Sequence, residues 1–293
     1  MRLFERINRR GVTLRPMAKP HDRPLTFHDV RQAVRRSVRV IADDCAAWCA
    51  EAPEQWRSTP SHNPLDKVGP LRLPFDSMWI EWVYPKSPHS DGTNFAAWVT
   101  ADDPQPYEHA PPGTVQIVNS VLFTGQKSAV RYSPVEVTMA VDAHGTCIGL
   151  DSFGAYDSAY TDYTFGALIP QIAAIGFMNC RNVEVADSGE SERVRQPGKR
   201  TKHSAQRLEP LRHHTIVLPT RGHLRTIASA QAVSGGPAAL HKVRGHFKTY
   251  RPDAPLLGRH IGTYWWHDAV RGLREQGVIE ASYRVGPSER AAR

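Results

Sequence analysis

The side chains best suited to chemistry lie near the C-terminal end of the chain. Residues 241–250 read HKVRGHFKTY, and in an extended segment alternate side chains share one face. That face would carry Arg244, His246, Lys248 and Tyr250. Arginine and lysine bind phosphates, and tyrosine stacks on nucleobases. The pattern predicts a nucleic-acid-binding surface.

Further cationic and aromatic residues follow downstream. We expect the same surface to include Arg259, Tyr264, Trp265, Trp266 and Arg271.

The distribution of charge favours a polyanionic partner. Residues 191–293 carry 19 basic and 7 acidic side chains, a net charge of +12, and residues 1–40 carry 11 and 3, a net charge of +8. Residues 41–190 carry 7 and 19, a net charge of −12. Either the two basic ends contact a polyanion or they dock on the acidic middle. We favour the first, with nucleic acid as the partner and its type, DNA or RNA, left open.

Two alternatives use the same C-terminal residues. In the first, the protein is a metal-independent ribonuclease that uses C-terminal His, Arg, Lys and Tyr side chains, with His246, Lys248 and Tyr250 as the catalytic candidates. His246 would act as the base, and Arg244 and Lys248 would stabilise the charge that develops on the phosphate. In the second, the basic segment is a protein-interaction module that docks on an acidic protein partner.

Metal and cofactor sites are not expected. His241, His246, His260 and His267 could converge on a metal, but the tight spacing typical of zinc sites is missing. The phosphate-binding, dinucleotide-binding, zinc-protease and serine-hydrolase motifs are also missing from the sequence. Four cysteines make no disulfide framework, and Cys45 and Cys49 lie on or beside an apolar helical stripe, so we expect buried thiols.

The hydrophobic pattern predicts an α+β fold. A capping-box pattern at Thr26 and Asp29 opens a helix that is expected to continue to a point before Pro53. Strand patterns at 79–84, 95–100, 115–123 and 135–142 predict an antiparallel sheet with one solvent-exposed face. An apolar segment with helical spacing, 160–180, is expected to cover the other face.

Composition divides the chain into four segments. We expect a basic arm at 1–24, an α+β domain at 25–186, a flexible linker at 187–209 and a basic, β-rich C-terminal module at 210–293.

No segment resembles a targeting signal or a membrane span. The basic N-terminus is not followed by an apolar stretch, and the most apolar segment, 165–178, is too short to cross a bilayer. We therefore expect a cytoplasmic protein with no membrane partner.

Four C-terminal segments resemble the signature of a family of uncharacterised proteins of bacteriophages and mobile elements. They lie between residues 241 and 272 and read HKVRGHFKTY, LLGRH, GTYWW and VRG. Upstream, FMNCRNV at 177–183 resembles the central segment of that family. The resemblance covers about the last half of the chain and brings no activity with it. It implies a phage-encoded accessory protein acting in the host cell, and the charge pattern suggests a nucleic-acid-associated, regulatory role.

Overall fold

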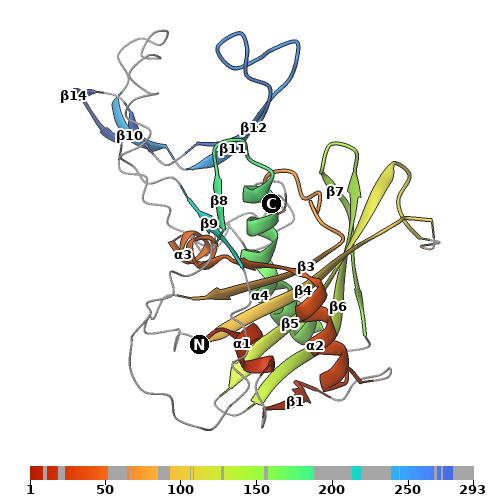
Figure 1. Cartoon of the computed structure of the whole chain (residues 1–293). Coiled ribbons are helices and arrows are strands. Elements are labelled where there is room, and N and C mark those ends of the chain that lie inside the picture. Colours follow the sequence, from red (N-terminus) through yellow and green to blue (C-terminus); the bar gives the residue numbers. More distant parts are fainter. Residues whose placement is uncertain are drawn as a thin grey trace, which may run out of the picture. The chain divides into compact units, whose positions relative to one another are not determined.

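The computed structural model shows an α+β fold built around one large mixed sheet (Figure 1). The structure describes residues 1–8, 12–18, 24–51, 65, 68–84, 93–105, 107, 109–126, 129–154, 158–187, 213–218, 239–243, 245–266, 269–271 and 273–279.

The chain forms two compact units. The first combines Met1–Leu218 with Phe247–Trp265, and the second combines Pro219–His246 with Trp266–Arg293. The first unit therefore includes a short C-terminal piece of the chain in addition to its N-terminal part, Met1–Leu218.

The first unit contains a sheet with nine strands among its described residues, in the order β1-β6-β5-β4-β3-β2-β9-β8, with β7 also paired to β6. Neighbours from β3 to β7 are antiparallel, as the sequence predicts. The sheet as a whole is mixed, because β1 is parallel to β6, and β2 is parallel to β3 and β9. The strands are β1 (Thr13–Pro16), β2 (Val38–Ile41), β3 (Ser77–Val83), β4 (Asn94–Asp102), β5 (Thr114–Gln126), β6 (Ala129–Asp142), β7 (Cys147–Phe153), β8 (Glu184–Asp187) and β9 (His214–Val217).

Helices cover both faces of this sheet (Figure 1). The larger core lies between the sheet and the pair α3 (Asp43–Glu51) and α4 (Ser158–Met178). The smaller core lies between the opposite face and the pair α1 (Leu3–Ile7) and α2 (Phe27–Arg36). The covering helix near 160–180 is confirmed. The other face, expected to be exposed to solvent, is partly covered by α1 and α2.

The prediction of a single long helix after Thr26 is wrong. Its start is confirmed, since the Asp29 N–H donates to Thr26 Oγ1 at 3.2 Å and the Thr26 N–H donates to Asp29 Oδ2 at 2.9 Å. The helix ends at Arg36, and β2 (Val38–Ile41) intervenes before α3. Val38, Val40 and Ile41 are β-branched residues, which favour a strand when sheet partners are available on both sides.

The expectation of an arm at 1–24 also fails for the described part of that stretch. Leu3, Phe4 and Ile7 on α1 are buried in the smaller core, and β1 pairs with β6. One helical turn with three apolar residues is too short to show a period in the sequence, so only packing reveals its role.

A buried carboxylate holds α1 against the sheet. Glu81 on β3 accepts hydrogen bonds from the backbone N–H groups of Leu3, at 2.8 Å, and Phe4, and from Trp79 Nε1 at 2.7 Å. The preceding residue, Arg2, forms a two-pronged ion pair with Asp43 at 2.6 and 2.9 Å. Arg2 thus ties the start of the chain to the first residue of α3.

The C-terminal part does not form one separate module. β9 joins the main sheet, and β11 (His246–Tyr250) pairs with β12 (Gly262–Trp266). In the second unit, β10 (Ala239–Val243) pairs with β13 (Ala269–Arg271) antiparallel and with β14 (Leu273–Ile279) parallel. Apart from Asp187, which ends β8, the expected linker at 187–209 lies outside the described residues.

Two further expectations can be compared with the described side chains. Cys45 and Cys49 are buried and not disulfide-bonded, as predicted, and burial raises the pKa of both thiols. Among the helices described, none is long and apolar enough to cross a membrane.

Candidate nucleic-acid interface

The described part of the predicted surface centres on the β11–β12 hairpin. Because side chains alternate along a strand, Phe247 and Thr249 share one face of β11, and Lys248 and Tyr250 share the other. Phe247 points toward α3 and α4 within the first unit, and Lys248, on the opposite face, is exposed.

Four aromatic rings anchor the inner face of the hairpin. Phe247 and Trp265 lie with ring centroids 4.8 Å apart, and each contacts Phe177 at the end of α4, at 4.9 and 5.0 Å. Trp48 on α3 packs edge-on against Trp265 at 5.0 Å. Aromatic residues packed in this way contribute most of the burial at such a contact, so the hairpin is held firmly on α3 and α4.

This packing corrects one predicted binding residue. Trp265 is only 2% exposed and belongs to the larger core, so its ring cannot stack on a nucleobase. A tryptophan beside a cationic segment looked like a stacking plate in the sequence, but strand alternation turns it inward.

The polypeptide segment after α4 clamps the backbone of β12. The Asn182 side chain donates from Nδ2 to the Trp265 carbonyl at 2.7 Å and accepts the Trp265 N–H at Oδ1 at 2.8 Å. The Arg181 N–H donates to the Thr263 carbonyl at 2.9 Å. The Asn182 amide therefore bonds to β12 as a neighbouring strand would.

The two stretches that carry the resemblance noted above meet at this anchor. Phe177, Arg181 and Asn182 come from the upstream stretch, and Phe247 and Trp265 come from the C-terminal one. These residues therefore build a structural support for the hairpin.

The outer face combines a cation with two phenols. Lys248 is exposed, and its Nζ lies 5.0 Å from the centre of the Tyr250 ring. Tyr250 and Tyr264, on the neighbouring strand, pack edge to face with centroids 5.9 Å apart. Lysine above a tyrosine ring keeps its charge available to solvent and so to a phosphate.

The loop joining the two strands adds further cations. Arg251, Arg259 and His260 are exposed there. Arg259 Nε donates to His260 Nε2 at 3.1 Å, which orients the guanidinium group. The backbones of Leu256 and His260 exchange two hydrogen bonds of 2.8 and 2.9 Å, so the end of the loop is an ordered turn.

The other predicted residues are placed only in part. His246 is exposed at the start of β11, and Trp266 is half-buried at the end of β12. Arg244 and His267 lie outside the described residues, and the side chains of His241 and Arg271 are not described although their backbones lie in β10 and β13. Among the described side chains, no group of three or more histidine, cysteine or carboxylate residues could hold a metal ion.

A polar row on the main sheet was not predicted. The strand register places Thr100, Asn119, Thr138 and Asp151 side by side on β4, β5, β6 and β7. Asn119 accepts from Thr138 Oγ1 at 2.8 Å and donates to Asp102 and to the Tyr107 hydroxyl, both at 2.7 Å.

Burial, and next the nearby Asp102, raise the pKa of Glu136, which lies one pair further along the sheet on the same face. The sequence carries no local signal of this polar row, because its residues lie far apart along the chain and only the strand register brings them together.

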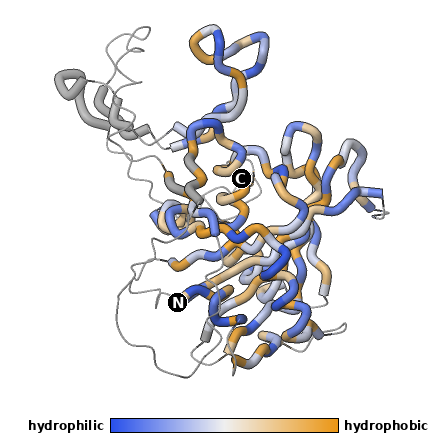
Figure 2. The backbone as a smooth tube through the Cα atoms, viewed as in Figure 1, coloured by the Kyte–Doolittle hydropathy of each residue, from blue (hydrophilic) through white to orange (hydrophobic). Residues whose placement is uncertain are grey.

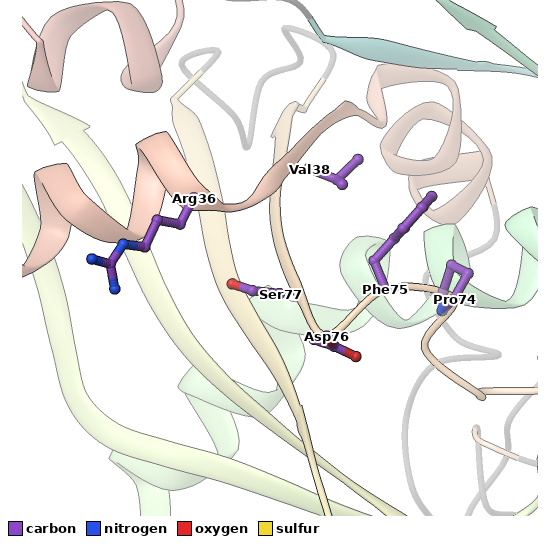
Figure 3. A pocket seen from close by; sticks show the side chains of 6 residues that line it. All are labelled: Arg36, Val38, Pro74, Phe75, Asp76 and Ser77. Carbon is purple, nitrogen blue, oxygen red and sulfur yellow. The ribbon is translucent and has the colours of Figure 1, made fainter.

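A shallow hollow beside β3 brings no nucleophile and base together (Figure 3). It measures about 440 Å³ and is lined by Arg36, Val38, Pro74, Phe75, Asp76 and Ser77. The Ser77 hydroxyl is bonded to Ser37 Oγ at 2.7 Å and to Trp98 Nε1 at 3.1 Å. The hydroxyl thus has a structural role between β3, β4 and α2.

Comparison of the chain with protein-family models, with curated proteins and with solved structures finds no significant match. The functional argument therefore depends on the site itself.

Proposed function

We propose that the protein is a nucleic-acid-associated accessory protein that contacts phosphates through the outer face of the β11–β12 hairpin. The observation that carries the proposal is the set of exposed cations, Lys248, Arg251 and Arg259, on a hairpin whose inner face is anchored by Phe247 and Trp265. The resemblance noted from the sequence extends the proposal to a phage-encoded protein with a regulatory role in the host cytoplasm.

Rigid anchoring supports binding at this site. Charged side chains on a packed hairpin lose less conformational entropy on binding than the same side chains on a mobile chain. Tyr250 and Tyr264 add apolar contact area next to the cations, a combination common where proteins contact nucleic-acid backbones and bases. The net charge of +12 over residues 191–293 would attract the polyanion at long range.

The strand geometry favours binding over acid–base cleavage. Residues four apart on a strand are separated by roughly 13 Å, so His246 and Tyr250 do not start from positions that flank one phosphorus atom. Tyr250 is also engaged by Lys248 and Tyr264. These contacts suit a binding surface.

The test is fluorescence anisotropy of labelled RNA, single-stranded DNA and duplex DNA with the full chain at several salt concentrations. Affinity should fall steeply between about 50 and 200 mM salt, because phosphate contacts release counterions. Lys248→Ala, Arg251→Ala and Arg259→Ala should each weaken binding to all sequences and reduce the slope of log affinity against log salt by about 1.

Arg72→Ala is the matched control, since Arg72 is exposed in the acidic part of the chain and its loss should leave the slope unchanged. Equal effects of all four variants would contradict the proposal. Displacement of the labelled nucleic acids by polyglutamate at equal charge concentration would favour an acidic protein partner. RNA cleavage that persists with a chelator and disappears in His246→Ala would favour the ribonuclease.

A further inference from the structure

The tip of the β11–β12 loop holds a leucine in an unfavourable position. Leu257 has a φ of 52° and is followed by Gly258 with a φ of 72°. The Arg259 N–H donates to the Leu256 carbonyl at 3.2 Å, which closes a turn around these two residues. Two central residues with positive φ characterise the type I′ hairpin turn, where asparagine or aspartate normally precedes glycine.

An apolar side chain at this position has no evident structural purpose. Leu257 is the only described residue other than glycine with a positive φ, and its side chain is 54% exposed. A leucine in this conformation is disfavoured relative to asparagine, and its exposure shows that core packing does not compensate for the strain. Strain that folding does not require is a reason to look for a role in binding.

The loop that carries Leu257 also carries exposed cations, together with one exposed carboxylate, Asp253. Ile261, 48% exposed, adds a second apolar side chain where the loop meets β12, and Arg251, Arg259 and His260 are exposed in the same loop. Figure 2 shows hydrophobic and hydrophilic residues alternating closely along this loop. An apolar point within a basic rim is the combination that architectural proteins use to enter a DNA groove and separate two base pairs.

We propose that the hairpin bends duplex DNA by inserting Leu257 between adjacent base pairs, while Lys248, Arg251 and Arg259 hold the flanking phosphates. This inference rests on the proposed function and specifies its substrate as duplex DNA. Inserted apolar wedges unstack one base step and kink the duplex, which brings more phosphates toward the protein.

The shape of the hairpin favours duplex DNA over duplex RNA. The loop between the two strands folds into two turns, and the one that carries Leu257 is closed by two backbone hydrogen bonds between Leu256 and His260. A compact turn of this kind can enter a groove of B-form DNA. The major groove of A-form RNA is too deep and narrow for side chains to read, and its minor groove is too shallow to surround a tip. The cations of the rim also match a phosphate backbone on either side of the groove.

The experiment measures DNA bending by energy transfer between dyes at the two ends of a duplex of about 30 base pairs, bound to the full chain. Wild-type protein should shorten the end-to-end distance, consistent with a kink of roughly 20–90°. Leu257→Asn should abolish most of this change. The asparagine suits the positive φ, so the variant should fold at least as stably as the wild type in a thermal unfolding measurement.

The control is Val115→Asn, which removes an exposed apolar side chain at the start of β5 and should leave bending unchanged. Salt-dependent binding to the duplex without bending, or bending that survives in Leu257→Asn, overturns the wedge and leaves the proposed function intact. Tighter binding to single strands or to RNA than to duplex DNA also overturns the wedge and leaves the proposed function intact. If the full chain binds none of the nucleic acids and instead binds vesicles of anionic lipid, both the wedge and the proposed function are overturned.

Discussion

At the scale of single residues, Glu81 is the least expected feature of the molecule. Burial raises its pKa from the ordinary value of 4.5 to about 7, although three N–H donors and Arg2 oppose that effect. The folded state therefore binds this proton more tightly than the unfolded chain does. The contribution of Glu81 to the free energy of unfolding is complete below about pH 4.5 and is lost as the pH rises toward 7.

Glu81→Gln should remove this pH dependence. The difference in unfolding free energy between the variant and the wild type should shift in favour of the variant by roughly 3 kcal/mol from pH 4.5 to pH 8, since glutamine has no proton to lose. Urea unfolding at a series of pH values measures it. A constant difference across that range would show that Glu81 has the same pKa in the folded and the unfolded state.

At the same scale, the orientation of Trp265 decides how the C-terminal segment is understood. One position along the strand separates the buried Trp265 from the half-buried Tyr264. Composition alone treats the two as equivalent aromatic residues. Strand alternation turns Trp265 toward the core, where it contacts Phe177 on α4 and Trp48 on α3, and turns Tyr264 toward the surface.

At the scale of elements, the hairpin depends on Asn182. Asn182→Ala should lose both hydrogen bonds to Trp265 and destabilise the docked hairpin by about 1–3 kcal/mol. Hydrogen exchange of the Trp265 amide should accelerate accordingly, while amides in the centre of β5 should not change.

Asn182→Asp separates the two bonds. The aspartate can still accept the Trp265 N–H, but its second oxygen meets the Trp265 carbonyl without a proton to donate. It should destabilise the hairpin at least as much as alanine does near neutral pH, and less at a pH low enough to protonate the aspartate. Exchange rates equal to those of the wild type in both variants would contradict the clamp.

At the scale of the whole molecule, the C-terminal hairpin completes the main hydrophobic core. A chain ending at Leu218 would leave Trp48 and Phe177 without Phe247 and Trp265. It should unfold at a lower temperature than the full chain and bind the dye ANS, because an aromatic surface normally buried is open to solvent.

The matched control is the full chain with Lys248→Ala, which alters the outer face of the hairpin and should keep the wild-type unfolding temperature. An equally stable truncated chain without ANS binding would show that the hairpin is an accessory to a self-sufficient unit.

Local patterns in the sequence were sufficient for several elements. The Thr26 and Asp29 capping box, the alternation in β6 and the apolar helix α4 are set by interactions within a few residues, and the structure contains all three. The buried cysteines on α3 followed from the same kind of short-range spacing.

Only the tertiary structure decided the remainder, because the relevant partners lie far apart in the sequence. Val38–Ile41 becomes a strand since β3 and β9 flank it, and Leu3–Ile7 becomes a core helix since Glu81 receives its first N–H groups. The candidate site shows the same division. The sequence determined that cations and aromatic rings are concentrated near the C-terminus, whereas pairing of β11 with β12 on α3 and α4 determined which of them face solvent. A side chain faces the core or the solvent according to strand register, and register depends on contacts between distant segments that composition and spacing do not contain.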